Sequence, residues 1–263
     1  MAYTPIDKPS DFFTPFIWTG DGATTNALTG VGFQPDLVWG KCRSNANENR
    51  LTDVVRGVTK EIYSDTSAAE ATTANGLKAF GSDGFTVGDN TGWNGSSRTY
   101  VSWNWKAGTS VSGDTTGSGT LKTYTGSVNT DAGFSIIKYT GNGTAGHTIP
   151  HHLGAQPQVV ICKRLSSSGQ WVFGSMALPS QFEQFLELDL SGAVQTSSLR
   201  WNDTDPSSSV FTVGSTADTN DSGADIIAYS FAEKQGYSKF GSYVGNGNAD
   251  GTFVYTGFKP AYV

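Results

Sequence analysis

An internal repeat is the feature that most limits how this chain can fold. The segment FIWTGDG, followed by TGVGFQPDLVWGKCRS, is repeated as IIKYTGNG and HHLGAQPQVVICKRLS, so that Pro35 corresponds to Pro157 at an offset of 122 residues. A third copy opens at FGSYVGNG and runs to TGFKPAYV, where Pro260 takes the same position. Because successive copies of a repeat share one fold, we expect two complete structural units and the opening of a third.

The later halves of the first two units also correspond. GFTVG at 84–88 matches VFTVG at 210–214, and TYVSWNWKA matches DIIAYSFAE. The connecting segment is dominated by Gly, Ser and Thr, a composition typical of a flexible or loosely β connector. The predicted division is an N-terminal arm (1–13), a first β-sandwich repeat (14–107), a linker (108–133), a second β-sandwich repeat (134–238) and the opening strands of a third repeat (239–263).

Within each unit the apolar residues lie in short blocks rich in β-branched and aromatic side chains, which predict strands. The glycine-rich segments between them, TGDG and TGNG among them, predict tight turns. Helical spacing is limited to 51–60, where Asp53 and Arg56 would pair on one helix face, and to 179–185. We therefore expect an all-β fold of tandem β-sandwiches, jelly-roll or concanavalin-like, with short helices in the connections.

Composition and charge argue against several classes of partner. The net charge of −6 provides no basic surface for a phosphate backbone, so nucleic acid is not an expected partner. The sequence has no run of eighteen apolar residues and opens without a signal peptide, so neither membrane insertion nor Sec export is expected. Cys42 and Cys162 are far apart and outside any CxxC, and we expect buried strand residues rather than a disulfide.

The three histidines, His147, His151 and His152, form a cluster that invites a metal-site interpretation. A structural role is preferred, because Thr29 and Gly30 stand at the first-unit positions of His151 and His152, and no Cys or acidic residue lies at ligand spacing. No metal and no other cofactor is expected. No GxSxG motif occurs either, so a serine hydrolase is not indicated.

Carboxylates offer two further hypotheses. Asp65 and Asp189 occupy matching repeat positions, and with Glu183 and Glu187 they are candidate acids for a glycosidase. Matching positions favour a shared structural job, such as accepting backbone N–H groups, so we do not expect an enzyme. Oxygen ligands for Ca²⁺ are available in two polar segments, from Asp218, Asn220, Asp221, Asp225 and Asp250. Their spacing is not that of an EF-hand, and exposed polar loops are the preferred interpretation.

Most of the seven tryptophans lie in or beside predicted strands and are expected in the core. An exposed indole beside amide side chains, however, suits a sugar, because the ring stacks on a pyranose while the amides bind its hydroxyls. Trp93, in the polar segment NTGWNGSS, lies outside any predicted strand. Together with Asn90 and Asn94 it is the predicted glycan-binding site.

Several long segments follow one another through nearly the whole chain: AYTPIDKPSDFF, LTDVVRGVTK, GSDGFTVG, YVSWNWKAG, GFSIIKYTGNGTAGHTIPHHLG, TDPSSSVFTVG and FAEKQGYSKFGSYVGNGNADGTFVYTGFKP. In this order they resemble the repeated domains of virion structural proteins from tailed bacteriophages, particularly marine ones. The resemblance implies a virion structural protein, part of a tail fibre or tail-associated appendage, that contributes to host-surface attachment. It implies synthesis in the bacterial host cytoplasm and a final location in the virion.

The partners implied by the resemblance are further copies of this chain, other tail proteins of the virion and a host cell-surface glycan. Fibres are usually trimers, so a homotrimer is the expected assembly. The alternative functions are a host-glycan (receptor-binding) module, a polysaccharide-degrading tailspike and a head decoration protein. Related chains often continue past GFKPAYV, so 239–263 is expected to belong to a longer chain or to complete a neighbouring domain or subunit.

Overall fold

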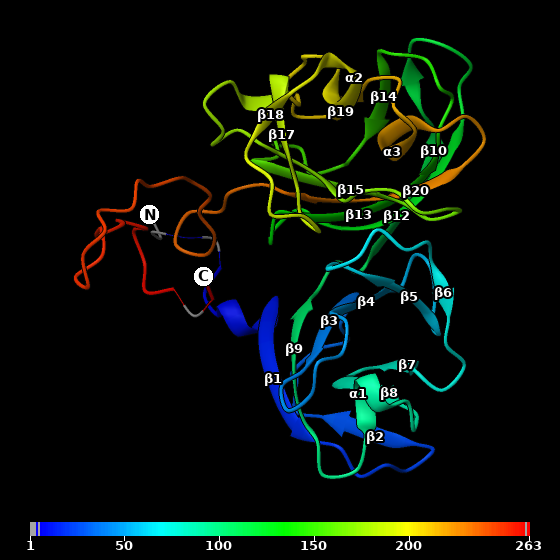
Figure 1. Cartoon of the computed structure of the whole chain (residues 1–263), viewed down its shortest axis with the longest axis vertical. Helices are drawn as coiled ribbons and strands as arrows, with labels where there is room; N and C mark the ends of the chain where they lie inside the picture. Colours follow the sequence, from blue (N-terminus) through cyan, green and yellow to red (C-terminus); the bar gives the residue numbers. More distant parts are fainter. Residues whose placement is uncertain (1–3, 5, 261) are drawn as a thin grey trace.

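The computed structural model of the chain describes residues 4, 6–260 and 262–263, and its regular structure is almost entirely β (Figure 1). The few helical segments are single turns in connections: the 3₁₀ turns η1 (Pro9–Asp11) and η2 (Gln181–Glu183), and the α-helices α1 (Thr91–Asn94), α2 (Ser198–Trp201) and α3 (Ala217–Asn220). The prediction of an all-β fold with short helices in the connections is confirmed. Both cysteines are free and buried in strands, as expected.

Residues 13–105 form two antiparallel sheets. Their strands are β1 (Phe13–Thr19), β2 (Asn26–Thr29), β3 (Leu37–Cys42), β4 (Arg50–Asp53), β5 (Lys60–Tyr63), β6 (Ala71–Thr72), β7 (Leu77–Gly81), β8 (Gly84–Val87) and β9 (Thr99–Trp105). The larger sheet has six strands in the order β1-β9-β3-β4-β5-β6, and the smaller has three in the order β2-β8-β7.

Residues 109–231 form two further antiparallel sheets. Their strands are β10 (Thr109–Asp114), β11 (Thr116–Gly117), β12 (Thr123–Asn129), β13 (Phe134–Thr140), β14 (His147–Pro150), β15 (Val159–Arg164), β16 (Val172–Ser175), β17 (Gln184–Glu187), β18 (Gln195–Thr196), β19 (Val210–Val213) and β20 (Asp225–Phe231). The larger sheet has eight strands, β10-β12-β13-β20-β15-β16-β17-β18, and the smaller has three, β11-β14-β19.

The two large sheets repeat one strand order, as the sequence repeat requires. The run β1-β9-β3-β4-β5-β6 corresponds, strand for strand along the repeat, to β13-β20-β15-β16-β17-β18. The eight-stranded sheet has two more strands: β12 pairs with β13, and β10 pairs with β12 at the edge of the sheet. These strands come from the Gly/Ser/Thr-rich segment 108–133, so much of that segment is part of a sheet.

The four sheets stack as layers (Figure 1). Successive side chains of a strand point to opposite faces of its sheet, so each large sheet contributes side chains to two cores. In β3, Val38 packs with the β2-β8-β7 sheet, whereas Leu37 faces the eight-stranded sheet. In β13, Ile137 packs toward the β11-β14-β19 sheet, whereas Ile136 faces the six-stranded sheet. The two large sheets are therefore the inner layers, and their central strands are buried on both faces, whereas the edge strand β10 is largely exposed.

We call the contact between the two large sheets the seam. Its buried apolar side chains are Leu37, Leu51, Ile62, Ala107, Phe134, Ile136, Leu165, Trp171, Ile227 and Tyr229. Hydrogen bonds also cross it: among them, the Tyr229 hydroxyl donates to Asp53 Oδ2 at 2.7 Å, and the Trp171 indole N–H donates to the carbonyl of Tyr63 at 2.7 Å. The seam thus combines apolar burial with specific polar contacts between the two halves of the chain.

The helix predicted over 51–60 is wrong. Leu51 and Asp53 lie in β4, a turn follows, and Lys60 opens β5. The spacing of Asp53 and Arg56 reflects that turn: the Asp53 carboxylate accepts the backbone N–H of Arg56 and its Nε, the latter at 2.6 Å. Both side chains are buried against the seam, so this is an interior ion pair rather than one on a helix face. At 179–185 only the single turn η2 forms before β17.

The segment 239–263 lies to one side of both sheet pairs, beside the start of β1 (Figure 1). Its described residues, 239–260 and 262–263, contain no helix or strand. Two of its aromatic rings lie against the rest of the chain. Phe240 lies 6.0 Å from Phe231, and Tyr262 lies 5.6, 5.8 and 6.4 Å from the rings of Phe13, Trp103 and Trp105. Most of its large apolar side chains are exposed.

Candidate functional site

The predicted glycan-binding group of Asn90, Trp93 and Asn94 is not a surface platform. Trp93 and Asn94 are completely buried in α1, and Asn90 is half-buried as its N-cap. The Trp93 ring packs under β3 so closely that a Cβ at Gly40 would overlap it. Because neither face of the indole is open to solvent, stacking on a sugar there is excluded and this site prediction is wrong.

Trp93 instead belongs to a buried polar network centred on Glu61. The indole N–H donates to Glu61 Oε1 at 2.6 Å, and Arg50 forms an ion pair with the other carboxylate oxygen. Thr73 donates a further hydrogen bond to that oxygen at 3.1 Å. A buried carboxylate needs such partners to remain charged. Sequence analysis did not single out Glu61; an acidic residue inside the strand-like block KEIY was the available signal.

Asn94 fixes the turn between β1 and β2. Its Oδ1 accepts the backbone N–H of Asp21 at 3.1 Å, and its Nδ2 donates to Asp21 Oδ1 and to the carbonyl of Ala23, at 2.8 and 3.1 Å. Its own carbonyl accepts the N–H of Gly22. The polar character of this segment, which suggested exposure, arises because a glycine-rich turn needs hydrogen-bond partners inside the protein.

The second half of the chain contains the same arrangement around Asn220, in α3. Oδ1 of Asn220 accepts the N–H of Asn142 at 2.9 Å, and its Nδ2 donates to the carbonyl of Thr144 at 2.9 Å. Its carbonyl accepts the N–H of Gly143. Asn220, a candidate Ca²⁺ ligand in the sequence, is therefore a buried turn clamp like Asn94.

The three histidines point to different partners. His147 is buried between Asn220 Oδ1, at 3.1 Å from Nδ1, and Thr115 Oγ1, at 2.6 Å from Nε2. His152 Nε2 lies 2.7 Å from the Tyr124 hydroxyl. His151 accepts the N–H of Leu153 and donates to the Ser207 carbonyl, which fixes a neutral ring with the hydrogen on Nε2. Burial lowers the pKa of His151 to about 4.

The remaining candidate calcium ligands of α3 and β20 are paired with basic side chains. Asp218 forms an ion pair with Arg200, and Asp221 lies 2.9 Å from Arg164 Nη1. Asp225 lies 3.4 Å from Lys138 Nζ. Across the described part of the chain, no group of three His, Cys, Asp or Glu side chains is arranged to hold a metal ion.

Asp65 and Asp189 both accept backbone N–H groups. The Asp65 carboxylate accepts the N–H of Asn49 at 3.0 and 3.2 Å, and Asp189 Oδ1 accepts the N–H of Trp171 at 3.0 Å. In each case the donor lies just before a strand, β4 or β16. The two matched aspartates therefore share one structural role, accepting a backbone N–H group, as the repeat suggested. The two residues also line one cavity of about 540 Å³ at a margin of the seam.

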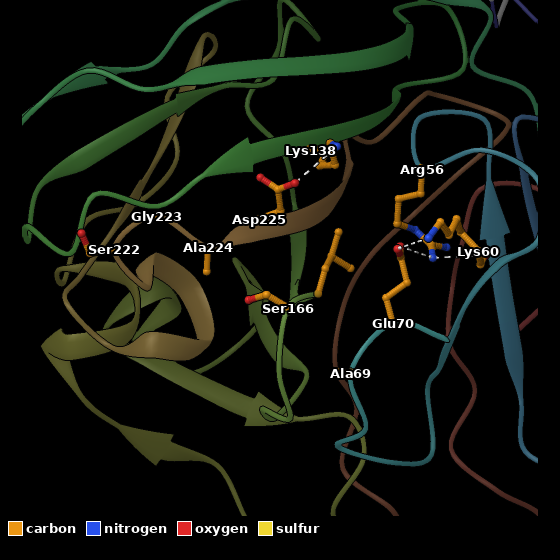
Figure 2. Close-up of a pocket in the computed structure, with 11 residues that line it drawn as sticks. Arg56, Lys60, Ala69, Glu70, Lys138, Ser166, Ser222, Gly223, Ala224 and Asp225 are labelled. Carbon is orange, nitrogen blue, oxygen red and sulfur yellow. Dashed lines mark hydrogen bonds and ion pairs between the residues drawn. The ribbon is translucent and has the colours of Figure 1, made fainter. Parts of the chain in front are cut away.

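A larger cavity of about 740 Å³ lies at another margin of the seam (Figure 2). Its polar lining side chains come from both halves of the chain: Arg56, Lys60, Glu70, Lys138, Ser166 and Asp225. In Figure 2 the group of Arg56, Lys60 and Glu70 lies on one side, and the pair of Lys138 and Asp225 on the other. The backbone N–H of Glu70 donates to the carbonyl of Leu165 at 2.9 Å, which joins the two sides.

Every cation of this larger cavity is matched to a carboxylate of its own half. Lys60 Nζ lies 3.7 Å from Glu70 Oε1, and Arg56 Nη1 lies 3.3 Å from Glu70 Oε2. Burial opposes the charge of Arg56, but Asp53, Tyr229 and Glu70 together outweigh it and raise the pKa of the guanidinium. Since Lys138 is matched to Asp225, this cavity offers no uncompensated charge to a ligand, and its ion pairs hold the margin of the seam.

The class of protein follows from these observations: an all-β chain of duplicated sheet pairs, with buried asparagine clamps at its repeated turns. A family model, the domain of unknown function DUF7483, matches residues 8–263, and the chain belongs to that family. No curated protein and no solved structure matches the chain. The jelly-roll or concanavalin-like layout and the division into tandem domains therefore stay predictions. None of the described helices is long and apolar enough to cross a membrane.

Proposed function

We propose that this chain is a structural, non-enzymatic component of a bacteriophage tail fibre or tail-associated appendage, and that it contributes to attachment at the host surface. The ordered resemblance to repeated virion domains supports this proposal, and so does the duplicated all-β architecture. In this proposal the chain lies in the virion and contacts copies of itself, as a trimer, and other tail proteins.

The assembly role rests on one observation: in 239–263, large apolar side chains are exposed although their counterparts in the first two repeat units are buried. Tyr243 is 67% exposed, although its repeat counterparts Trp18 and Tyr139 are buried. Phe253 is 86% exposed, although its counterpart Leu28 in the first unit is buried. A group of large exposed apolar side chains within one segment is typical of a protein–protein contact. We infer that this segment packs against another polypeptide in the assembled appendage.

Sedimentation of the purified chain tests this role. We expect self-association at micromolar concentration, which the double variant Tyr243→Ser/Phe253→Ser weakens without changing the thermal unfolding of the sheets. The matched control, Val58→Ser, removes an exposed apolar side chain outside the segment and should leave association unchanged. A wild-type chain that stays monomeric and binds no other tail protein would contradict the assembly role.

A further inference from the structure

The smaller seam cavity has polar groups that are left to bind something other than this chain. The side-chain amide of Asn49, which is half-buried, and the exposed hydroxyl of Ser191 make no hydrogen bond to the part of the chain that the structure describes. The exposed carboxylate of Asp65 accepts only the backbone N–H of Asn49. Asp189 offers less, because the N–H of Trp171 occupies its Oδ1 and its Oδ2 has almost no accessible surface. Unpaired polar groups around a cavity are costly unless a ligand or water satisfies them.

The same cavity has an apolar side. Trp39 lies half-buried at the edge of the seam cluster, and its ring lines the cavity. Leu190, which is 51% exposed, and Leu188 line it from the other half of the chain. Apolar and polar groups thus face one space of about 540 Å³, a size within the usual range for small-ligand sites.

The chemistry of the lining selects a class of ligand. The carboxylates of Asp65 and Asp189 disfavour an anion, and a purely apolar ligand would displace water from Asp65 and Asn49 without replacing its hydrogen bonds. No metal-holding group of three acidic, His or Cys side chains occurs in the described residues. A saccharide fits both sides, since its C–H faces pack on an indole and its hydroxyls donate to carboxylates and accept from amides.

We propose that this cavity binds a neutral saccharide, with Trp39 against a C–H face and Asp65 and Asn49 on the hydroxyls. The site is built from both halves of the chain, so the seam is what creates it. This inference rests on the attachment role proposed above and gives that role a place on the molecule, different from the one that the sequence suggested.

Saturation-transfer NMR of the full chain with methyl glycosides of glucose, galactose, mannose and N-acetylglucosamine tests the proposal. We expect saturable binding of at least one glycoside, and a loss of affinity of about tenfold in Trp39→Ala, which corresponds to about 1.4 kcal/mol. Asn49→Ala removes an amide that makes no hydrogen bond within the described part of the chain, and it should also weaken binding. Tyr255→Ala removes an exposed aromatic ring far from the cavity in sequence and serves as the control.

Thermal unfolding of each variant separates lost binding from lost folding, and Trp39→Phe, which keeps an aromatic ring, should retain part of the affinity. The proposal is overturned if the folded wild-type chain binds none of the four glycosides, or if Trp39→Ala and Asn49→Ala bind as the wild type does. Release of sugar from the bound glycoside would also overturn it, in favour of an enzyme. Absence of binding leaves the structural role standing, since that role is tested on the assembled protein.

Discussion

At the scale of single residues, buried polar side chains explain much of this molecule. Glu61, Asp53, Asn94 and Asn220 are all fully buried, and each is surrounded by donors or acceptors that satisfy it. Removing one partner of such a group leaves the other unpaired in a low-dielectric interior, which costs more than the hydrogen bond itself contributes. Point substitutions at these residues therefore report directly on the structure.

Trp93→Ala should lower the free energy of unfolding by about 3–5 kcal/mol, the usual cost of truncating a buried tryptophan. Trp93→Phe should cost less, because it keeps most of the apolar contact with β3 and removes only the donor to Glu61. Urea unfolding measures both. A change below about 0.5 kcal/mol in Trp93→Ala would instead be typical of a surface side chain.

His151 should make stability depend on pH. Its pKa is about 4 in the folded protein and about 6.5 when unfolded, so the unfolded chain takes up a proton first as the pH falls. The contribution of His151 to the free energy of unfolding is fully present above about pH 6.5. It is lost progressively toward about pH 4, by about 3 kcal/mol in all.

Urea unfolding of wild type and His151→Gln across that range measures this contribution. The variant should have a shallower loss of stability with falling pH, because its amide keeps a donor and an acceptor but does not titrate. Equal pH dependence in the two proteins would rule out a buried neutral His151.

At the scale of elements, the sequence predicts strands and turns well and helices poorly. The blocks GFTVG and VFTVG become β8 and β19, with glycine and asparagine at the turns. The misassigned 51–60 has apolar residues at helical spacing, but β4 pairs with β3 and with β5, Asp53 caps the intervening turn, and Leu51 packs in the seam. That competition depends on tertiary contacts, which local periodicity does not contain.

The candidate site shows the same limit. The polar neighbours of Trp93 suggested exposure, yet Asn94 is polar because it clamps an internal turn. Trp39 was assigned to the core from its strand, and only the packing of the two large sheets places it at a cavity margin. A repeat tells which residues are equivalent, but not how the copies pack against each other.

Asn94→Ala and Asn220→Ala test the turn clamps as equivalent elements. Each should destabilise the protein by about 1–3 kcal/mol for every backbone group left unpaired. The side-chain amide of Asn220 donates to one more backbone carbonyl, that of Gly214. Asn220→Ala should therefore lower the free energy of unfolding at least as much as Asn94→Ala. Chemical unfolding measures the difference, with the exposed Asn45→Ala as control. If both clamp variants are as stable as the control, the clamp interpretation is wrong.

At the scale of the whole molecule, the seam should couple the two halves of the chain. Because the large sheets share a buried cluster and the bond from Tyr229 to Asp53, we expect residues 13–105 and 109–231 to unfold in one cooperative transition. Tyr229→Phe should lower its midpoint as a whole, by the equivalent of about 1.5–3 kcal/mol for a hydrogen bond to a charged group. Calorimetry with two resolved transitions, of which Tyr229→Phe shifts one, would contradict this coupling.

We proposed that this chain is a building block of a virion appendage. Electron microscopy of purified, intact phage particles labelled with an antibody against the chain tests this role most directly. We expect label on the tail or its fibres, in a number set by the symmetry of the appendage. Particles without label, with the chain recovered only from the soluble fraction of lysed host cells, would contradict it.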